Sequence, residues 1–317
     1  MWKFKSQGNS HTVYDRFPVI IYFKIKNILR IPKVQKENQE YVRDYHEHVT
    51  NLLLGKQYYA SLEMTALDQF QIDGQVMTGY GLLQSDYTVS LTSTKVLTLE
   101  IKPKYAISNG STCDFCLHSY WKQARKEKEF IEDFCPFDLY SLDPLRMTRS
   151  LLALSNHSRL KIFYNGVYDK GSDGILHMYP SKQEYFKDVV QILVRDPILK
   201  RLNQCHAHAR NKPLKKLMTL VDQISHKNLK QLLETLKTFH VQDSDVKKFL
   251  ISKSLMDVSI MIRIENNFSP GSEKIGDYYY TIGVIDVQPK DIEKLRLYSK
   301  TEQEIFLLKG IRACNLN

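Results

Sequence analysis

The sequence predicts a mixed α+β fold, because segments with strand periodicity and segments with helical periodicity both recur along the chain. Residues 97–101 alternate leucine or isoleucine with threonine and glutamate, the period of two expected of a β-strand. Residues 36–54 instead carry aromatic and aliphatic side chains at helical intervals, which is typical of an amphipathic helix. Residues 258–262 and 278–287 are again rich in isoleucine, valine and tyrosine and predict two further strands.

Composition limits the possible classes of protein. The 317 residues are 43% hydrophobic, which is enough for a substantial core in one large domain or two smaller ones. Lysine and arginine total 45 against 35 acidic residues, and the net charge of +10 favours a polyanionic partner: nucleic acid, anionic lipid or a phosphorylated small molecule. Five cysteines, an odd number, and a polar N-terminus without a signal peptide predict reduced thiols in the cytoplasm or nucleus. No apolar run reaches about 18 residues, so we expect no membrane span.

One motif ends the predicted strand at residues 97–101 with an unusual group of charges. Glu100 is followed by Lys102 and Lys104, which are separated by Pro103. Proline lacks a backbone donor and ends ladder pairing, so both lysines should leave the sheet together. Two ammonium groups so placed suit phosphates, although a solvated turn after an edge strand would explain the same residues.

The string Glu-Ile-Lys-Pro-Lys resembles the signature of the inositol-pentakisphosphate 2-kinase family, and later segments resemble the same family in the same order. Residues 135–141 are close to the family's Pro-Leu-Asp-Leu-Phe/Tyr-Ser, and residues 257–262 resemble its Asp-Cys-Ser-Ile-Met-Ile. The resemblance implies a two-lobe kinase-like fold. We expect a small β-rich N-lobe at residues 1–86, which covers the nucleotide, and a larger α/β C-lobe at residues 87–317, which binds the inositol phosphate.

The resemblance also implies a set of nucleotide-binding residues. A turn between strands at residues 6–13, followed by a β-rich segment at 19–25, matches the family's glycine loop, although Ser6 replaces its first glycine. Asp86 falls in residues 82–87, which we place between two strands as a lobe-connecting hinge, and could bind adenine or ribose; an Asx-turn would explain this aspartate equally well. The implied nucleotide-binding residues are Gly8, Asn9, Arg30, Asp86, Glu100, Lys161 and Met261.

A second set matches the positions that bind the inositol phosphate. Cys113 and Cys116 have Cys-x-x-Cys spacing, which could indicate zinc with His118 as a third ligand, but the sequence offers no second ligand pair nearby. We therefore interpret the segment as the family's Cys-Met-His segment, with His118 and Lys122 one helical turn apart. Lys290, Lys294 and Tyr298 are spaced by four on a predicted C-terminal helix. The implied substrate-binding residues are Lys104, His118, Lys122, Arg159, Lys290, Lys294 and Tyr298.

Two aspartates at strand boundaries and one lysine complete the implied site. Asp257 takes the position of the catalytic base that accepts the proton of the attacking hydroxyl. Lys102 would neutralise the transferring phosphoryl group. Asp286 takes the position of the metal ligand, for Mg²⁺. Without the resemblance, surface aspartates would explain both carboxylates.

The expected activity is transfer of the ATP γ-phosphoryl to the 2-hydroxyl of inositol 1,3,4,5,6-pentakisphosphate, giving inositol hexakisphosphate. We expect a monomer without a nucleic-acid partner. Two alternatives stay open. Departures from the family pattern at Ser6, Asp114, Met256 and Ser158 are compatible with a catalytically weak relative that only binds inositol polyphosphates. The positive charge is compatible with a basic nucleic-acid-binding protein, although no such motif is present.

Overall fold

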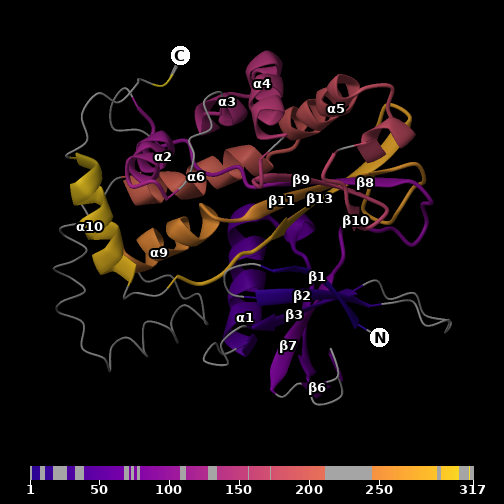
Figure 1. The fold of residues 1–317 in the computed structure, drawn as a ribbon, viewed down its shortest axis with the longest axis horizontal. Coiled ribbons are helices and arrows are strands. Elements are labelled where there is room, and N and C mark those ends of the chain that lie inside the picture. The colour runs from indigo at the N-terminus through magenta and orange to yellow at the C-terminus, as the bar shows by residue number, and fades with distance from the viewer. Residues whose placement is uncertain are drawn as a thin grey trace.

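The computed structural model describes residues 2–7, 11–16, 27–32, 39–67, 71–72, 75–76, 79–107, 112–127, 134–155, 157–171, 173–210, 245–290, 294–306 and 314. The strands are β1 (Trp2–Gln7), β2 (His11–Arg16), β3 (Asn27–Pro32), β4 (Leu62–Ala66), β5 (Gln71–Ile72), β6 (Gln75–Val76), β7 (Tyr80–Ser85), β8 (Val96–Ile101), β9 (Leu160–Tyr164), β10 (Val167–Tyr168), β11 (Ser259–Glu265), β12 (Glu273–Ile275) and β13 (Tyr278–Ile285). The helices are α1 (Gln39–Val49), α2 (Asp114–Ala124), α3 (Pro136–Tyr140), α4 (Pro144–Leu154), α5 (Lys182–Arg195), α6 (Ile198–Arg210), α9 (Asp245–Leu255) and α10 (Lys294–Phe306), with short turns η1 (Thr50–Leu54), η2 (Lys56–Tyr58) and η3 (Asp173–His177). Helices and antiparallel sheets together confirm the predicted α+β class (Figure 1).

The N-terminal part of the chain forms a five-stranded antiparallel sheet in the order β1-β2-β3-β7-β4, drawn in indigo and purple in Figure 1. Helix α1 packs against β4 and β7, so the helix predicted from residues 36–54 is confirmed in α1 and η1. Residues 8–10 and 19–25 lie outside the described residues. One prediction is wrong: residues 82–85 belong to β7, and only Asp86 and Tyr87 follow that strand.

The second sheet has six antiparallel strands in the order β10-β9-β8-β11-β13-β12. Its centre contains β8, which we predicted from the alternation of residues 97–101, and all six residues of this strand are buried. Leu97, Leu99 and Ile101 join the main hydrophobic core. Thr98 lies on the other face, where its hydroxyl donates to the Tyr87 carbonyl at 2.9 Å. The alternation therefore separates an apolar face from a polar face that is also covered.

Helices cover the apolar face of this second sheet. Figure 1 shows α3, α4, α5 and α6 together above β8, β9 and β11. Helix α4 packs on α3 and α5, and α6 packs on α9, so their apolar residues continue the core. Helix α5 begins with a side-chain cap, since the Ser181 hydroxyl accepts from the Glu184 amide at 3.2 Å. Helices therefore cover one face of the sheet, and the other face carries polar residues that include Thr98 and Glu100 of β8.

No helix within the described ranges has the length and apolar character needed to cross a membrane.

Candidate active site

The ends of β8 and β13 bring the predicted phosphoryl-neutralising lysine and the predicted metal ligand together. Lys102, one residue after β8, donates from Nζ to Asp286 Oδ2 at 3.1 Å. Asp286 follows β13 with φ of 64°, in the left-handed region that aspartate and asparagine tolerate better than most residues. Burial disfavours the charged form of Lys102, but Asp286 and Glu100 outweigh it and raise its pKa. Lys102 is therefore a fixed cation beside a carboxylate.

A serine that sequence reasoning missed connects this pair to Glu100. The Ser259 side chain is completely buried at the start of β11. Its hydroxyl lies 3.0 Å from Glu100 Oε1 and 3.2 Å from Asp286 Oδ2, so one hydroxyl proton serves two carboxylates. The strand pattern alone gave no signal for this contact, because it depends on how β8 and β13 flank β11.

Three predicted nucleotide-binding residues form a row across the second sheet. Lys161, Glu100 and Met261 are direct cross-strand neighbours on β9, β8 and β11, and Gly283 of β13 continues the row. Lys161 Nζ donates to Glu100 Oε2 at 3.2 Å. Gly283 must lack a side chain, because a Cβ there would lie 2.2 Å from the Tyr87 ring. The segment that follows β7 thus packs directly on the sheet beside the predicted nucleotide-binding row.

The predicted catalytic base lies between two predicted substrate-binding lysines. Asp257 follows α9, and its carboxylate accepts from Lys104 Nζ at 3.2 Å and from Lys290 Nζ at 2.8 Å. Half of the Asp257 side chain is exposed, whereas each lysine side chain is 17% exposed. Burial alone would raise the pKa of Asp257, but Lys104 and Lys290 outweigh it and hold the pKa far below its usual range. Asp257 is therefore fully ionised at neutral pH.

Helix α2 places His118 and Lys122 one turn apart, as predicted. Burial lowers the pKa of His118 to about 4, with further lowering from the charges of Lys253 and Lys122, while Asp257 acts in the opposite sense. His118 is thus neutral at pH 7 and surrounded by cations. Arg159 lies over the Phe115 ring at 4.6 Å, and burial lowers its pKa.

We expect the protein to lose stability as the pH falls from about 6.5 to 4. Burial lowers the pKa of both His118 and His206 to about 4, so the unfolded chain takes up these protons first and the folded state is penalised. Each unit of pKa difference corresponds to about 1.4 kcal/mol. Thermal unfolding between pH 7.5 and 4.5 measures the slope, and His206→Gln should flatten it; an unchanged slope would contradict this origin.

The remaining predicted substrate-binding residues depart from the predicted arrangement. Lys290 lies before α10 rather than on a helix with Lys294 and Tyr298, so the prediction of one helical face is wrong for Lys290. Lys294 is exposed at the first position of α10. The Tyr298 ring packs against Phe249, with centroids 6.1 Å apart.

The predicted N-terminal nucleotide contacts are placed only in part. Gly8 and Asn9 lie outside the described residues, and Arg30 is a β3 residue opposite Leu82 of β7. Asp86 is buried, and its Oδ1 accepts from the amide and the hydroxyl of Thr88 at 2.9 and 2.7 Å. These contacts match the Asx-turn that the sequence also allowed.

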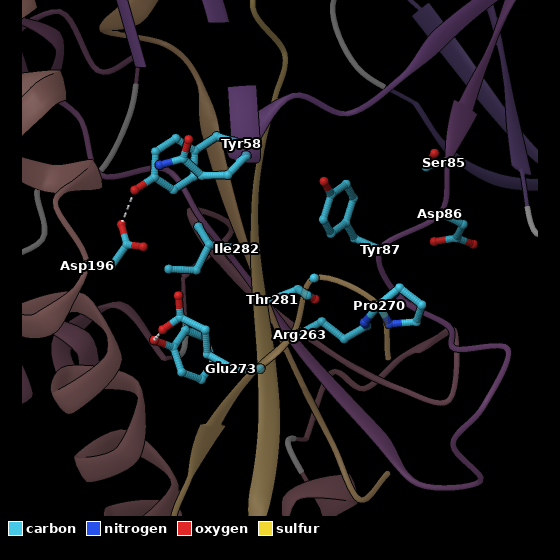
Figure 2. Close-up of a pocket in the computed structure, with 13 residues that line it drawn as sticks. Tyr58, Ser85, Asp86, Tyr87, Asp196, Arg263, Pro270, Glu273, Thr281 and Ile282 are labelled. Carbon is cyan, nitrogen blue, oxygen red and sulfur yellow. Dashed lines mark hydrogen bonds between the residues drawn. The ribbon is translucent and has the colours of Figure 1, made fainter. Parts of the chain in front are cut away.

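Asp86 also lines a cavity of about 300 Å³ beside β13, shown in Figure 2. Its walls carry three carboxylates, Asp86, Asp196 and Glu273, and a single guanidinium, that of Arg263. The cavity contains none of the predicted phosphate-binding cations, so its charge is unsuited to a polyphosphate. Asp86 is the one residue shared with the predicted site.

Comparison with known proteins assigns the family. The sequence profile described as "Inositol-pentakisphosphate 2-kinase" matches residues 68–304, which is more than half of the chain. The chain belongs to the inositol-pentakisphosphate 2-kinase family. A curated relative from Danio rerio, named inositol-pentakisphosphate 2-kinase, is 26% identical over 214 residues, covering 52% of this chain and 43% of the relative. The chain therefore spans less than half of that relative's length.

The family match covers the charged network but not every predicted residue. Glu100, Lys102, Asp257, Asp286 and Lys290 all fall inside residues 68–304. The predicted residues that lie outside this range are Gly8, Asn9 and Arg30. The part of the site that the structure describes in most detail thus lies within the range that matches the family.

Four cysteines of this family member form a cluster that the sequence interpretation did not foresee. The sulfur atoms of Cys113, Cys116, Cys135 and Cys314 all lie within 4.8 Å of one another. The thiols of Cys113 and Cys116 lower the pKa of Cys135, so a thiolate is favoured in the cluster. The sequence did not predict a zinc site, because it has no second ligand pair close to Cys113 and Cys116. In the folded chain Cys135 and Cys314 supply that pair, and four thiolates are a donor set that suits tetrahedral Zn²⁺.

We expect purified protein to contain about one zinc per chain, because a closed four-cysteine site binds Zn²⁺ tightly. Cys135→Ser should lose the metal and melt at lower temperature, since the metal would tie α2 and α3 to the segment at Cys314. Cys205→Ser is the matched control, because Cys205 is buried outside the cluster. Elemental analysis measures the metal content, and thermal unfolding measures the stability. Wild-type protein that contains no metal, or that keeps its melting temperature after chelation, would contradict the assignment.

Proposed function

We propose that this chain transfers the γ-phosphoryl group of ATP to the 2-hydroxyl of inositol 1,3,4,5,6-pentakisphosphate and releases inositol hexakisphosphate. One observation carries the proposal: an ionised carboxylate, Asp257, lies between Lys104 and Lys290, and its charge also acts on Lys102, which pairs with the second carboxylate, Asp286. A phosphotransferase with a hydroxyl acceptor needs cations for two sets of phosphates and a carboxylate at the attacking oxygen. The family assignment supports this reaction class.

The lysines around Asp257 suit a substrate of very high charge. Inositol pentakisphosphate carries about ten negative charges if each phosphate bears 1.5 to 2. Its phosphates would compete with Asp257 for Lys104 and Lys290, which are now its partners at 3.2 and 2.8 Å. Drawing these lysines towards phosphate removes the two charges that lower the pKa of Asp257. Substrate binding would therefore make Asp257 a stronger base at the moment when a base is needed.

Asp257 would act on the acceptor hydroxyl by orienting it and accepting its proton. Its position supports this role, since it follows α9 and precedes β11 rather than lying in the row of Lys161, Glu100 and Met261. In a loose phosphoryl-transfer transition state the nucleophile needs little activation, so orientation would account for part of the effect.

The residues at Asp286 fit a bound Mg²⁺. Lys102 already places a cation at this carboxylate, and Ser259 holds oxygens of Glu100 and Asp286 close together. Mg²⁺ prefers oxygen ligands and is often held by one or two carboxylates together with substrate phosphates. Bound there, it would neutralise the β- and γ-phosphates of ATP. Lys102 would be free to turn towards the transferring phosphoryl group.

We infer a two-lobe arrangement in which the nucleotide lies between the sheets. Strand β7 is the last strand of the five-stranded sheet along the chain, which then continues through Asp86 and Tyr87 to β8 of the second sheet. This supports a boundary near residue 86 between an N-lobe and a C-lobe. The Tyr87 ring, seated on Gly283, would form one end of the adenine site beside Met261. We further propose that the enzyme is a monomer of the cytoplasm or nucleus.

A catalytically weak relative that only binds inositol polyphosphates is the second candidate. Met256 favours it, since the family pattern has lysine at this position and the methionine is buried. A single assay separates the candidates. Purified protein is incubated with γ-labelled ATP, Mg²⁺ and inositol 1,3,4,5,6-pentakisphosphate, and the products are separated by anion exchange.

The proposal predicts labelled inositol hexakisphosphate, and no labelling of a pentakisphosphate already phosphorylated at the 2-position. Tight binding of the substrate without transfer would favour the binding-only relative. Salt-sensitive binding to many RNA or DNA sequences, without binding to inositol phosphates, would instead favour a nucleic-acid-binding protein.

A further inference from the structure

Lys253 lies beside the proposed substrate site, and its ammonium group lies among three aromatic rings. No sequence motif marks this lysine. It belongs to α9, and its Nζ lies 5.2 Å from the Phe249 ring, 5.3 Å from the Tyr298 ring and 5.9 Å from the Tyr105 ring. Aromatic faces attract an ammonium and hold it in place, but they do not neutralise its charge. The side chain is half-buried, so the ammonium keeps access to a ligand.

Lys253 also lies near the predicted substrate-binding histidine, since the charges of Lys253 and Lys122 both act on His118. The two lysines come from two different helices, α9 and α2. Cations that converge on one place from separate helices are typical of a site that binds a polyanion.

The position of Lys253 also links it to the lysine motif. Tyr105, one of its three rings, directly follows Lys104 in the chain. The position just before Asp257, where the family pattern has lysine, holds the buried Met256 and supplies no cation. Lys253 precedes it by three residues and belongs to the same helical segment, because the Met256 amide still donates to the Ser252 carbonyl at 3.0 Å.

We propose that Lys253 binds a phosphate of the inositol polyphosphate, next to the phosphates that meet His118 and Lys122. This inference rests on the proposed function and adds a residue to its substrate site. It also changes the role of Tyr298, whose ring packs on Lys253 and Phe249. Tyr298 acts as a positioning residue that holds the Lys253 ammonium, rather than as the phosphate contact that the sequence resemblance implied.

The test is a footprint on the wild-type protein, so it does not depend on the folding of a variant. Lysines are acylated with and without inositol hexakisphosphate, and the extent of labelling at each lysine is read by mass spectrometry. We expect at least threefold protection of Lys253 together with Lys104 and Lys290, and no protection of Lys187, which is exposed on α5. Protection of Lys104 and Lys290 without Lys253 overturns this inference alone. Protection of no lysine overturns the proposed function and this inference with it.

Two variants add a kinetic measurement. Lys253→Met removes the charge and keeps the aliphatic stem, and we expect KM for inositol pentakisphosphate to rise at least tenfold while KM for ATP changes less than twofold. Lys253→Arg keeps a cation that can stack on the same rings and should stay within threefold of wild type. Lys187→Met is the control for loss of one positive charge. Equal changes in both KM values, or none for the inositol phosphate, would contradict a phosphate contact.

Discussion

Asp286→Asn should abolish phosphoryl transfer and leave the fold intact. Asparagine has nearly the same shape as aspartate and also tolerates the φ of 64° at this position, so the backbone should not change. The substitution removes the negative charge that opposes Lys102 at 3.1 Å and that would hold Mg²⁺. Turnover is measured over a wide range of Mg²⁺ concentration, and thermal unfolding is measured on the same preparation.

The matched control is Asp143→Asn. Asp143 caps α4 by accepting from the Arg146 amide at 2.8 Å, and asparagine is an equally good cap. This variant should keep both turnover and melting temperature. Near-native, Mg²⁺-dependent activity of Asp286→Asn would show that the metal is held elsewhere.

Asp257→Asn should lower kcat by about 10² to 10⁴, the usual contribution of a positioned acid or base. We expect KM for ATP to stay unchanged, because the contacts of Asp257 are to Lys104 and Lys290 rather than to the row around Glu100. KM for the inositol phosphate should not rise, since loss of the carboxylate leaves both lysines available to phosphates. Steady-state kinetics with each substrate varied in turn measures all three quantities.

Stability alone cannot decide the role of Asp257, because neutralising it leaves two half-buried lysines facing each other. Asp138→Asn gives the necessary comparison. Asp138 is a buried carboxylate that accepts from Arg146 at 2.8 Å and lies 3.4 Å from Arg149, and neither arginine is a predicted site residue. It should lower the melting temperature and preserve kcat. If Asp257→Asn behaves in the same way, Asp257 is only a structural anchor for Lys104 and Lys290.

The sequence was most informative where function and local structure depend on the same short segment. The strand before Lys102 and Lys104 appears as β8, and the strands beside Asp257 and Asp286 appear as β11 and β13. Alternation and the position of Pro103 were sufficient for these predictions, because both act within a few residues. The antiparallel pairing that joins β8, β11 and β13 then brings their charged ends together.

Residues whose role depends on packing between distant segments could not be found in this way. Cys314 lies far along the chain from the Cys113 and Cys116 pair, so no local spacing marks it as a fourth ligand. Ser259 is a single serine within an apolar strand, and its two carboxylate partners come from neighbouring strands. Lys253 is one lysine on a helix, and the rings around it come from three segments.

The errors have equally specific causes. Residues 82–85 were placed in a hinge, but they belong to β7 and pair with β3 and β4. The polar residues Gln84 and Ser85 give this strand the composition of a loop. Lys290, Lys294 and Tyr298 have helical spacing, yet Lys290 precedes α10 and is held by Asp257 instead. Spacing by four indicates a shared face only where a helix is continuous.

A crystal structure with an ATP analogue, Mg²⁺ and inositol 1,3,4,5,6-pentakisphosphate tests the central claim most directly. We predict the 2-hydroxyl within about 2.6–3.2 Å of the Asp257 carboxylate, which is the reach required of a general base. Lys104 and Lys290 should have moved from Asp257 to the substrate phosphates, and the metal should lie on Asp286. A substrate bound away from Asp257, with both lysines still paired to it, would contradict the proposed site.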